Sequence, residues 1–433
     1  MDGPRVVLVA TLASFIDEID VGLLAVSFMQ LERQLGLAPD QLGLILMARG
    51  LAASLSGILW GSLADRTDRK NLMVLSLAMA GSCTLIAPCF PSLRGLMATQ
   101  MASGFFAAAA IPTTQSLVSE RVQESSRGGA FSILAMCAGF SNSAAAMLGA
   151  WSWQTAYRVM GSTSLMFALL IFIFFPADPR DRPDRKSLSG EISAELQEMR
   201  RIFCIPTFLA LLLGGVVGCI PWSALSFLMM YFQNLGFSPS HAAALLTIMS
   251  VGRIFGSLLG GLLGDSLARR LPLHGRALVG QSSILLGMAP LYWVLCCYPH
   301  SNRSSAALSL SLFVFSLTAM WCNPGVDRPL WAELVPADCR GKIIGWWKAV
   351  AESCGTIFGG PLVGYISVAL LGYQPSKSHN AESLGWAMAV CTMLPWAVCF
   401  CCYSAIHFTY PRDCPRKETA RLLPPELKMH RPH

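Results

Sequence analysis

Long apolar segments, each close to the length of a membrane span, recur along this chain. Twelve of them can be delimited, at residues 6–29, 41–63, 71–90, 95–119, 128–149, 157–177, 207–233, 241–264, 277–298, 306–332, 343–371 and 384–409. A helix needs about 20 predominantly apolar residues to cross the hydrocarbon core of a bilayer. The pattern therefore predicts an all-α polytopic membrane protein with twelve transmembrane helices.

One polar stretch, residues 178–206, separates the first six segments from the last six. It holds six Lys or Arg, six Asp or Glu and three prolines, which is the composition of a solvated connection. Residues 189–201 within it predict a short amphipathic helix at the membrane surface. We therefore expect an N-terminal six-helix bundle at 1–177, a cytoplasmic linker at 178–206, a C-terminal six-helix bundle at 207–409 and a cytoplasmic tail at 410–433.

The composition excludes most classes of soluble protein. Of the 433 residues, 54% are hydrophobic and 13% are charged, whereas a soluble globular protein has about 25% charged residues. The net charge of +7 comes without a run of Lys and Arg interleaved with aromatic residues, so we expect no nucleic-acid partner. The 15 cysteines are scattered or lie in apolar stretches, and they predict small buried side chains, with no metal and no other cofactor.

The distribution of basic residues predicts the orientation in the membrane. Lys and Arg are concentrated in the linker, in the loops on its side and in the C-terminal tail, and they are sparse in the opposite loops. Because cytoplasmic loops carry the excess of Lys and Arg, both termini of this multi-pass protein are expected in the cytoplasm. The sequence does not distinguish a plasma membrane from an organelle membrane.

Two sequence motifs occur once in each half of the chain. Residues 61–70 and 261–270 follow Gly-x-x-x-Asp-x-x-x-Arg-[Lys/Arg], and residues 120–128 and 333–341 follow Glu-x-x-x-x-x-x-Arg-Gly. Unrelated matches at nearly one offset are improbable, so we predict two duplicated, parallel halves related by an axis along the membrane normal. Asp265 is expected to pair with Arg269 and Arg270. Matched acids and bases at helix ends predict a gating network on the cytoplasmic side, formed by Gly61, Asp65, Arg66, Arg69, Lys70, Glu120, Arg127, Gly261, Asp265, Arg269, Arg270, Glu333 and Arg340.

The segment Gly61-Ser-Leu-Ala-Asp65-Arg66-Thr-Asp68-Arg69-Lys70 closely resembles the signature loop between the second and third helices of the major facilitator superfamily. Asp68 stands where that family usually has a second glycine. The resemblance implies two pseudo-symmetric six-helix bundles (the MFS fold) and a secondary transporter whose halves rock about a central site. Residues 16–29 and 60–70 are distantly similar to the spinster-like branch, whose fourth-helix glutamate is absent from residues 104–112.

Five charged residues lie inside predicted spans. Asp17, Glu18 and Asp20 stand near the centre of the first span, Arg49 in the second and Arg253 in the eighth. A charge at mid-bilayer costs about 2.5–3.5 kcal/mol on insertion scales, so each needs water, a partner or, for an acid, a proton. The acids either bind a coupling proton or substrate, or pair structurally with an arginine. Arg253 either meets a substrate carboxylate or phosphate, or forms an interhelical ion pair.

The tenth span contains Asn323-Pro-Gly-Val-Asp327-Arg328-Pro329, which must interrupt a regular helix because proline removes a backbone donor. Pro112 marks the matching place in the fourth span. Broken helices at matching positions of two halves point to a central pathway, with two ordinary proline kinks as the alternative. Asp327 and Arg328 are expected to form a local ion pair. In the eleventh span, Lys348 and Glu352 either pair with each other or face the pathway.

These features predict a secondary active transporter that moves a small organic solute by alternating access. We expect it to be coupled to a proton or another ion and to act as a monomer surrounded by membrane lipid. No ATP-binding phosphate loop and no catalytic constellation is present in the sequence, so we do not expect an enzyme. A non-transporting receptor or sensor on the same fold is the alternative. Substrate or ion binding is assigned to Asp17, Glu18, Asp20, Arg49, Arg253, Asp327, Arg328, Lys348 and Glu352.

Overall fold

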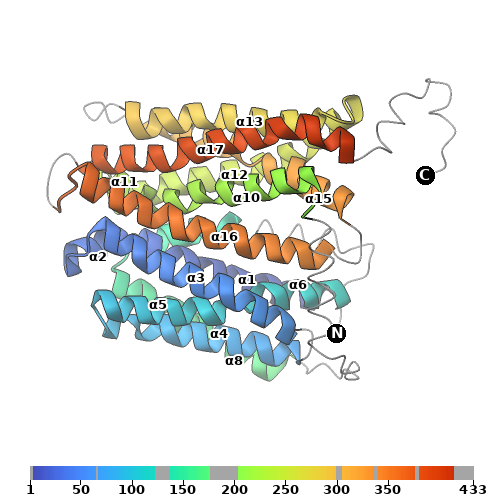
Figure 1. Cartoon of the computed structure of the whole chain (residues 1–433). Helices are drawn as coiled ribbons and strands as arrows, with labels where there is room; N and C mark the ends of the chain where they lie inside the picture. The colour runs from blue at the N-terminus through green and yellow to red at the C-terminus, as the bar shows by residue number, and fades with distance from the viewer. Residues whose placement is uncertain are drawn as a thin grey trace, which may run out of the picture.

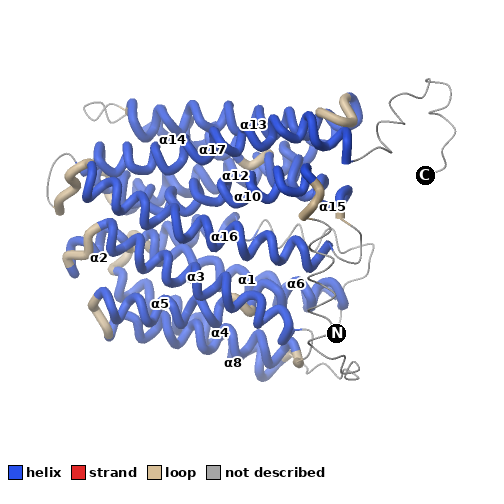
Figure 2. The backbone as a smooth tube through the Cα atoms, viewed as in Figure 1, coloured by secondary structure: helices blue, strands red, loops and turns tan. Residues whose placement is uncertain are grey.

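The computed structural model of the chain describes residues 3–64, 67–121, 137, 139–175, 203–298, 305–335, 340–375 and 380–413. Within these residues, all regular secondary structure is helical (Figure 2). Residues 139–148 are also helical. The other α-helices are α1 (Gly3–Val26), α2 (Phe28–Leu35), α3 (Pro39–Ala64), α4 (Arg69–Ile86), α5 (Leu93–Ala107), α6 (Ala110–Arg121), α8 (Trp153–Phe174), α10 (Pro206–Ala224), α11 (Leu228–Asn234), α12 (Pro239–Arg270), α13 (Gly275–Tyr292), α14 (Ser305–Ala319), α15 (Arg328–Leu334), α16 (Arg340–Tyr365) and α17 (Asn380–Asp413).

Nine helical stretches in the described part of the chain are long and apolar enough to cross a membrane. They correspond to the second, third and sixth to twelfth predicted spans. The first predicted span is also a single helix, α1, but it carries three acidic residues. The fourth is divided between α5 and α6, and the fifth runs partly outside the described residues. The helices are therefore consistent with twelve spans.

The fourth span is interrupted between α5 and α6, at residues 108–109. Backbone groups beside such a break lose their regular helical partners. The indole Nε1 of Trp60 donates to the Phe105 carbonyl at 2.6 Å, and the Ser76 hydroxyl donates to the Phe106 carbonyl at 2.9 Å. Side chains of α3 and α4 thus satisfy carbonyl groups at a break inside the bundle, as a membrane protein requires.

The tenth span is interrupted as well. α14 ends at Ala319, Asn323–Asp327 form a π-helical turn, and α15 begins at Arg328. Arg276, near the start of α13, donates from Nη1 to the Gly325 carbonyl at 2.9 Å. The tenth span is broken within the predicted segment, whereas the fourth is broken at residues 108–109, just before the predicted Pro112, which lies inside α6. Each break receives side-chain donors from a neighbouring helix.

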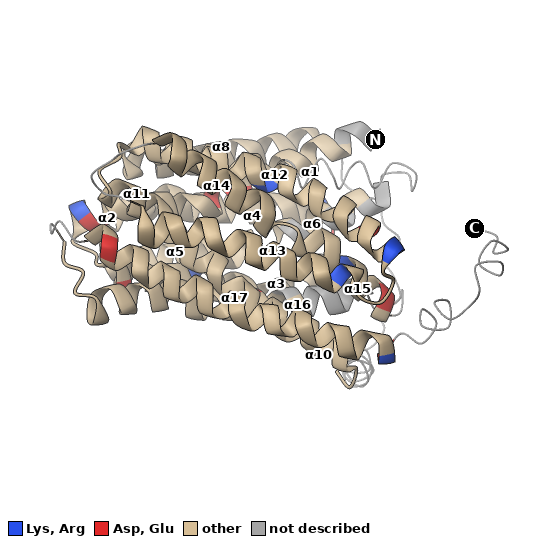
Figure 3. Ribbon diagram, turned by 90° about the horizontal axis from the view of Figure 1, so that it is seen from above, with Lys and Arg blue, Asp and Glu red and all other residues tan. Residues whose placement is uncertain are grey.

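The helices run side by side, and their ends define the two ends of the bundle (Figure 1). α1 begins and α17 ends at one of them, which we call the terminal end, while α2 and α11 lie at the opposite one, the far end. Lys, Arg, Asp and Glu gather mainly toward the two ends (Figure 3). Large apolar side chains remain exposed on the sides, among them Leu55, Leu262 and Phe408, which is the surface that a protein solvated by lipid presents.

Contacts between helices define two sets. In the first set α4 packs on α8 and α3 on α5, and in the second α10 packs on α17 and α12 on α14. The main contact between the sets is that of α3 against α16. Residues 176–202 lie outside the described residues. The predicted amphipathic helix in the linker, and the limits of the two halves, therefore stay predictions.

Glycines allow α3 and α16 to approach closely toward the far end. A Cβ atom at Gly43 would lie 2.7 Å from the Gly360 carbonyl oxygen, and one at Gly50 would also collide with α16. We call these three residues the glycine seam. Gly57 and Gly61 lie on the same face of α3 at 3.6 residues per turn, yet no described atom lies within 4 Å of a Cβ atom built there. The described parts of α3 and α16 therefore touch toward the far end and part toward the terminal end.

Substitution of Gly43 by Leu is expected to destabilise the protein by about 1–3 kcal/mol, because the backbone of α16 blocks the added side chain. Thermal unfolding of the purified protein in detergent measures this loss. Gly57→Leu is the matched control, since the same change on the same helix face meets no described atom. An equal loss of stability in both variants would contradict the seam.

Candidate functional site

A buried ion pair lies within the first set of helices. Nη2 of Arg49 on α3 lies 2.7 Å from Oδ2 of Asp20 on α1, and the two residues are only 4% and 7% exposed. Removing two charges from water is costly, and their attraction offsets that cost only where the remaining polar atoms are also hydrogen bonded. Of the alternatives that the sequence left open for Asp20, the structure shows the pairing with Arg49.

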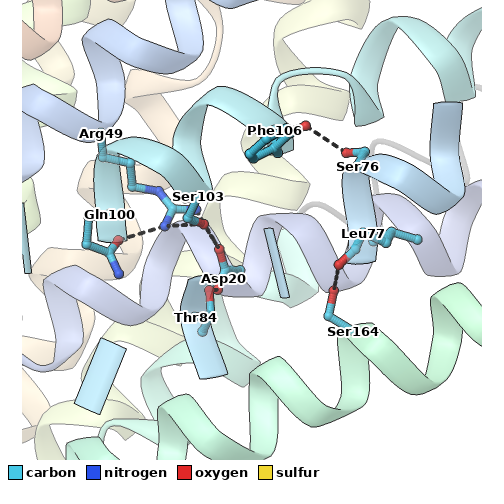
Figure 4. Close-up of polar contacts among 9 residues, drawn as sticks. All are labelled: Asp20, Arg49, Ser76, Leu77, Thr84, Gln100, Ser103, Phe106 and Ser164. Carbon is cyan, nitrogen blue, oxygen red and sulfur yellow. Dashed lines mark hydrogen bonds and ion pairs between the residues drawn. The ribbon is translucent and has the colours of Figure 1, made fainter. Parts of the chain in front are cut away.

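Three polar side chains complete this ion pair (Figure 4). Asp20 Oδ1 accepts from the Thr84 hydroxyl at 2.6 Å, and Asp20 Oδ2 accepts from the Ser103 hydroxyl at 3.1 Å. Nη1 of Arg49 donates to Gln100 Oε1 at 2.7 Å. We call these five residues, which come from α1, α3, α4 and α5, the Asp20–Arg49 network. Its three uncharged members were not predicted from the sequence, although polar residues in otherwise apolar segments are a usable signal.

Asp17 adds a second carboxylate to this site. It is buried and interacts electrostatically with Arg49. The Tyr157 hydroxyl on α8 is buried near the same charges and has no hydrogen-bond partner among the described residues. One guanidinium and two carboxylates carry one excess negative charge, which a single proton neutralises. The arrangement is therefore suited to binding and releasing a proton.

Glu18 and Arg253 interact electrostatically across the two sets of helices, from α1 and α12 respectively. Both are half-buried, in contrast to the enclosed Asp20–Arg49 network. The guanidinium carbon of Arg253 lies 5.2 Å from the ring centroid of Trp222 on α10, which is a cation–π contact. Arg253 is thus held in place by an aromatic face and balanced by an acid of the opposite set.

Trp222 belongs to a cluster of three aromatic rings from separate helices. The Trp222 centroid lies 6.2 Å from that of Phe315 on α14 and 5.9 Å from that of Trp396 on α17, and the latter two rings are also 5.9 Å apart. These are edge-to-face and tilted packings of normal strength. A stacked guanidinium keeps its planar fork of N–H donors for a carboxylate, so Arg253 and the aromatic cluster together form a candidate anion site.

Asp327 lies in the π-helical turn of the tenth span and accepts a hydrogen bond from the Tyr403 hydroxyl on α17 at 2.9 Å. The expected ion pair with Arg328 is wrong: the structure describes both residues, shows no ion pair between them, and leaves Arg328 exposed. The turn separates neighbouring side chains, and it directs Asp327 toward α17. Glu352 is exposed on α16, and the side chain of Lys348 lies outside the described residues.

The gating residues of the second set pair through an arginine that the sequence analysis did not name. Asp265 Oδ1 lies 3.1 Å from Nη2 of Arg276, and Glu333 Oε1 lies 3.9 Å from Nε of the same residue. The Tyr410 hydroxyl also donates to Glu333. The expected pairing of Asp265 with Arg269 and Arg270 is therefore corrected, because both of those arginines point to solvent at the end of α12.

The gating residues of the first set are described only in part. Asp65, Arg66 and Arg127 lie outside the described residues, as do the side chains of Glu120 and, in the second set, Arg340. Arg69 is buried at the start of α4. Asp68 caps that helix by accepting a hydrogen bond from the Lys70 amide at 3.0 Å, as short polar residues do at an N-cap.

No group of three or more His, Cys, Asp or Glu side chains in the described part of the chain is arranged to hold a metal ion. The charged side chains described above form two groups. They form the enclosed Asp20–Arg49 network with Asp17, and the half-buried pair of Glu18 and Arg253 between the two sets.

Comparison with known proteins identifies similar transporters. The sequence model of the Major Facilitator Superfamily matches residues 10–360. Solute carrier family 22 member 18 of Rattus norvegicus is 26% identical over 358 residues, 79% of this chain and 84% of that protein. The "Probable sulfoacetate transporter SauU" of Cupriavidus necator is 25% identical, with 86% of this chain and 87% of that protein covered. The 3-(3-hydroxy-phenyl)propionate transporter of Escherichia coli is 29% identical over 238 residues, 52% of this chain and 56% of that protein.

Solved structures show the same fold. A bacterial homolog of the human lysosomal transporter Spinster, in an inward-facing and unoccupied conformation, superposes with a TM-score of 0.81 at 16% sequence identity. The match covers 95% of this chain and 98% of that one. The MFS fold that the signature loop predicted, and the likeness to the spinster branch, are confirmed at the level of architecture.

Replacement of Asp20 by Asn is expected to destabilise the protein by about 3–5 kcal/mol, because it leaves the buried guanidinium of Arg49 without the carboxylate that it pairs with directly. Thermal unfolding of the purified protein measures the loss. The double variant Asp20→Asn with Arg49→Met removes both charges and is expected to recover much of it. A double variant no more stable than the single one would show that pairing is not what the network contributes.

Proposed function

The chain belongs to the major facilitator superfamily, and on this basis we propose that it is a secondary transporter that carries a small organic anion together with a proton by alternating access. Relatives named as transporters of sulfoacetate and of 3-(3-hydroxy-phenyl)propionate support the anion, since both named compounds are organic anions. A solved structure of a D-xylose–proton symporter on the same fold is compatible with the proton.

The observation that carries the proposal is the position of Arg253. Its side chain stays charged in any environment that a protein provides, it rests on Trp222, and it is only half-buried between the two sets of helices. An incoming carboxylate competes with Glu18 for this guanidinium. Once displaced, Glu18 lacks its cation and is favoured to take up a proton. Substrate binding and protonation are thereby linked at one arginine.

The Asp20–Arg49 network and Asp17 form the second part of the proposed coupling. A proton on either carboxylate weakens the hold on Arg49 and loosens the contacts among α1, α3, α4 and α5. Because these helices pack together as one set, we propose that loss of the Asp20–Arg49 ion pair shifts the whole set. In the other set, Asp327 lies in the broken helix and accepts a hydrogen bond from Tyr403 on α17. We propose that this carboxylate and this phenol respond to the same solute.

The described contacts support a state that is closed at the far end. α3 and α16 meet at the glycine seam and part beyond it toward the terminal end. We propose that the terminal end faces the cytoplasm and that the halves 1–177 and 207–409 rock about the seam. Closure of the terminal end then falls to the duplicated motifs, from Gly61 to Lys70 with Glu120 and Arg127, and from Gly261 to Arg270 with Glu333 and Arg340.

Flux measurements in proteoliposomes test the function. Uptake of radiolabelled aliphatic and aromatic carboxylates and sulfonates is compared with and without an inward proton gradient, and empty liposomes serve as the control. Gradient-driven accumulation of at least one anion is expected. Binding without flux for every anion would favour the receptor alternative, and flux of neutral or cationic solutes alone would reject the anion.

Replacement of Arg253 by Met should raise the KM for the transported anion about 10- to 100-fold, since a charge-assisted hydrogen bond contributes about 1.5–3 kcal/mol. Arg253→Lys should retain part of the affinity, because it keeps the charge but loses the planar fork. Arg94→Met removes an exposed charge at the start of α5, to which no role in binding or gating is assigned, and it should leave KM unchanged. Equal KM values for all three variants would remove Arg253 from the binding site.

Replacement of Asp17 by Asn should flatten the dependence of uptake on the pH of the far side, because the amide cannot bind the coupling proton. Initial rates measured from pH 5 to pH 8 provide the comparison. Glu382→Gln, which alters an exposed acid at the start of α17, is the control and should keep the wild-type profile. An unchanged profile in Asp17→Asn would exclude this residue from proton coupling.

A further inference from the structure

At the far end, the short helix α2 closes against the opposite set of helices. The Phe28 ring on α2 lies 4.8 Å from the Phe227 ring, centroid to centroid, and α2 packs on α11. One turn further along α2, Glu32 lies in the same contact and is only 6% exposed. A carboxyl group is thus buried between two parts of the protein that alternating access must separate.

Each side of this contact is anchored to its own set of helices. On the α2 side, Gln30 Nε2 donates to the Trp151 carbonyl at 2.6 Å, and Gln34 Oε1 accepts from the Trp153 indole at 2.8 Å. On the opposite side, the turn after α16 is fixed to α17 by Asn380, whose Nδ2 donates to the Gln374 carbonyl at 2.8 Å. When the two sets move apart, α2 and this turn must therefore separate.

Glu32 is held across the contact by Tyr373, a buried residue of the turn between α16 and α17. The Tyr373 hydroxyl donates to the Glu32 carboxylate, and it accepts from Asn234 Nδ2 at 3.3 Å. Asn234 ends α11. The bridge of Glu32, Tyr373 and Asn234 therefore joins the two sets at the far end and cannot survive their separation.

The bridge does not provide hydrogen-bond donors for both oxygens of an ionised Glu32. Its Oε1 atom is buried and has no hydrogen-bond partner among the described residues, and the neighbouring Arg33 is exposed. Burial raises the pKa of Glu32, while the hydrogen bond from Tyr373 and the charge of Arg33 lower it by less. A buried carboxyl with one unpartnered oxygen is favoured in its protonated form.

Among the described residues, no titratable group on the elements packed against α2 supplies a buried cation. Asp40 at the start of α3 is an acid, and the Tyr231 hydroxyl on α11 donates to the Val294 carbonyl at 2.7 Å. The acids of α1 precede Glu32 by at least twelve residues, Asp20 being the nearest in sequence.

We propose that Glu32 is a proton-binding site of the gate at the far end, which holds its proton while the gate is closed and releases it to the far-side solution when the gate opens. This inference rests on the proposed alternation of the two halves, and it adds a proton site outside the central charges. In this proposal, the hydrogen bond from Tyr373 adjusts how tightly Glu32 holds its proton, which a merely structural contact would not do.

The sign of the linkage follows from the two states. In the open gate Glu32 meets water and has its ordinary pKa of 4.5, and in the closed gate its pKa is higher. The closed state therefore binds the proton more tightly. The resulting stabilisation of the closed state relative to the open state is fully present below the ordinary pKa of Glu32, and it is lost as pH rises through the raised pKa. Between the two values, the ratio of open to closed gates should rise up to about tenfold per pH unit.

Single-molecule energy transfer across the far end tests the proposal. Fluorophores are attached through unnatural amino acids at Pro91 and Ser240, which are exposed at the far end of the two sets, so that the native cysteines stay untouched. The full-length protein in nanodiscs is measured without substrate from pH 4 to pH 8. The wild type should show a rising open fraction over this range, and Glu382→Gln, an exposed acid at the same end, should behave like the wild type.

Two variants separate a proton site from a structural contact. Glu32→Gln, a mimic of the protonated acid, should hold the gate closed with no dependence on pH. Tyr373→Phe removes the donor that favours the charged form in the closed gate, so the rise in its open fraction should continue to a higher pH than in the wild type.

An open fraction independent of pH in the wild type, or the same slope in Glu32→Gln, would overturn the proposal. So would a Tyr373→Phe variant whose open fraction stops rising at the same pH as the wild type or at a lower one, and this variant decides the matter if Glu32→Gln does not fold. Because the assay needs neither substrate nor flux, its failure leaves the proposed anion transport standing. Conversely, failure of transport leaves the gate measurement interpretable.

Discussion

The charge of an ionised side chain in the middle of an apolar bundle must be balanced by an opposite charge and by hydrogen bonds. This constraint organises the first set of helices. The guanidinium of Arg49 cannot lose its charge, so it requires the carboxylate of Asp20. The carboxylate in turn requires the hydroxyls of Thr84 and Ser103. Each requirement draws in another helix, until α1, α3, α4 and α5 are joined through a single ion pair.

The second set of helices solves the same problem in a more open way. Arg253 is balanced by Glu18 from the other set and is supported by the Trp222 ring, which offers no full charge in return. A pair of this kind is incomplete by comparison with the enclosed network. One arginine is thus satisfied within its own set, and the other is balanced across the interface. This difference is the basis of the roles proposed above, solute binding for Arg253 and coupling for Arg49.

Much of the fold could be predicted from the sequence, because the cost of exposing a helix backbone to lipid forces long apolar segments of regular length. The breaks in the fourth and tenth spans were predictable from proline, since its missing donor acts locally. Partners of individual charges were not. Asp265 contacts Arg276 rather than the arginines nearest in sequence, and Asp327 contacts Tyr403 on a helix far along the chain. Glu32 drew no attention because it sits outside the apolar segments, and only packing against the opposite set buries it.

Arg276 joins two features that the sequence keeps apart. Its guanidinium contacts Asp265 at the end of α12 and Glu333 on α15, and it also donates to the Gly325 carbonyl inside the break of the tenth span. The charged motif at the membrane surface and the irregular backbone below it therefore share one set of N–H donors. Any rearrangement of these charges must therefore also alter the hydrogen bond from Arg276 to the Gly325 carbonyl. Movement of the charged motif and movement of the broken helix are consequently coupled through Arg276. A substitution selected for its effect on one of them also alters the other.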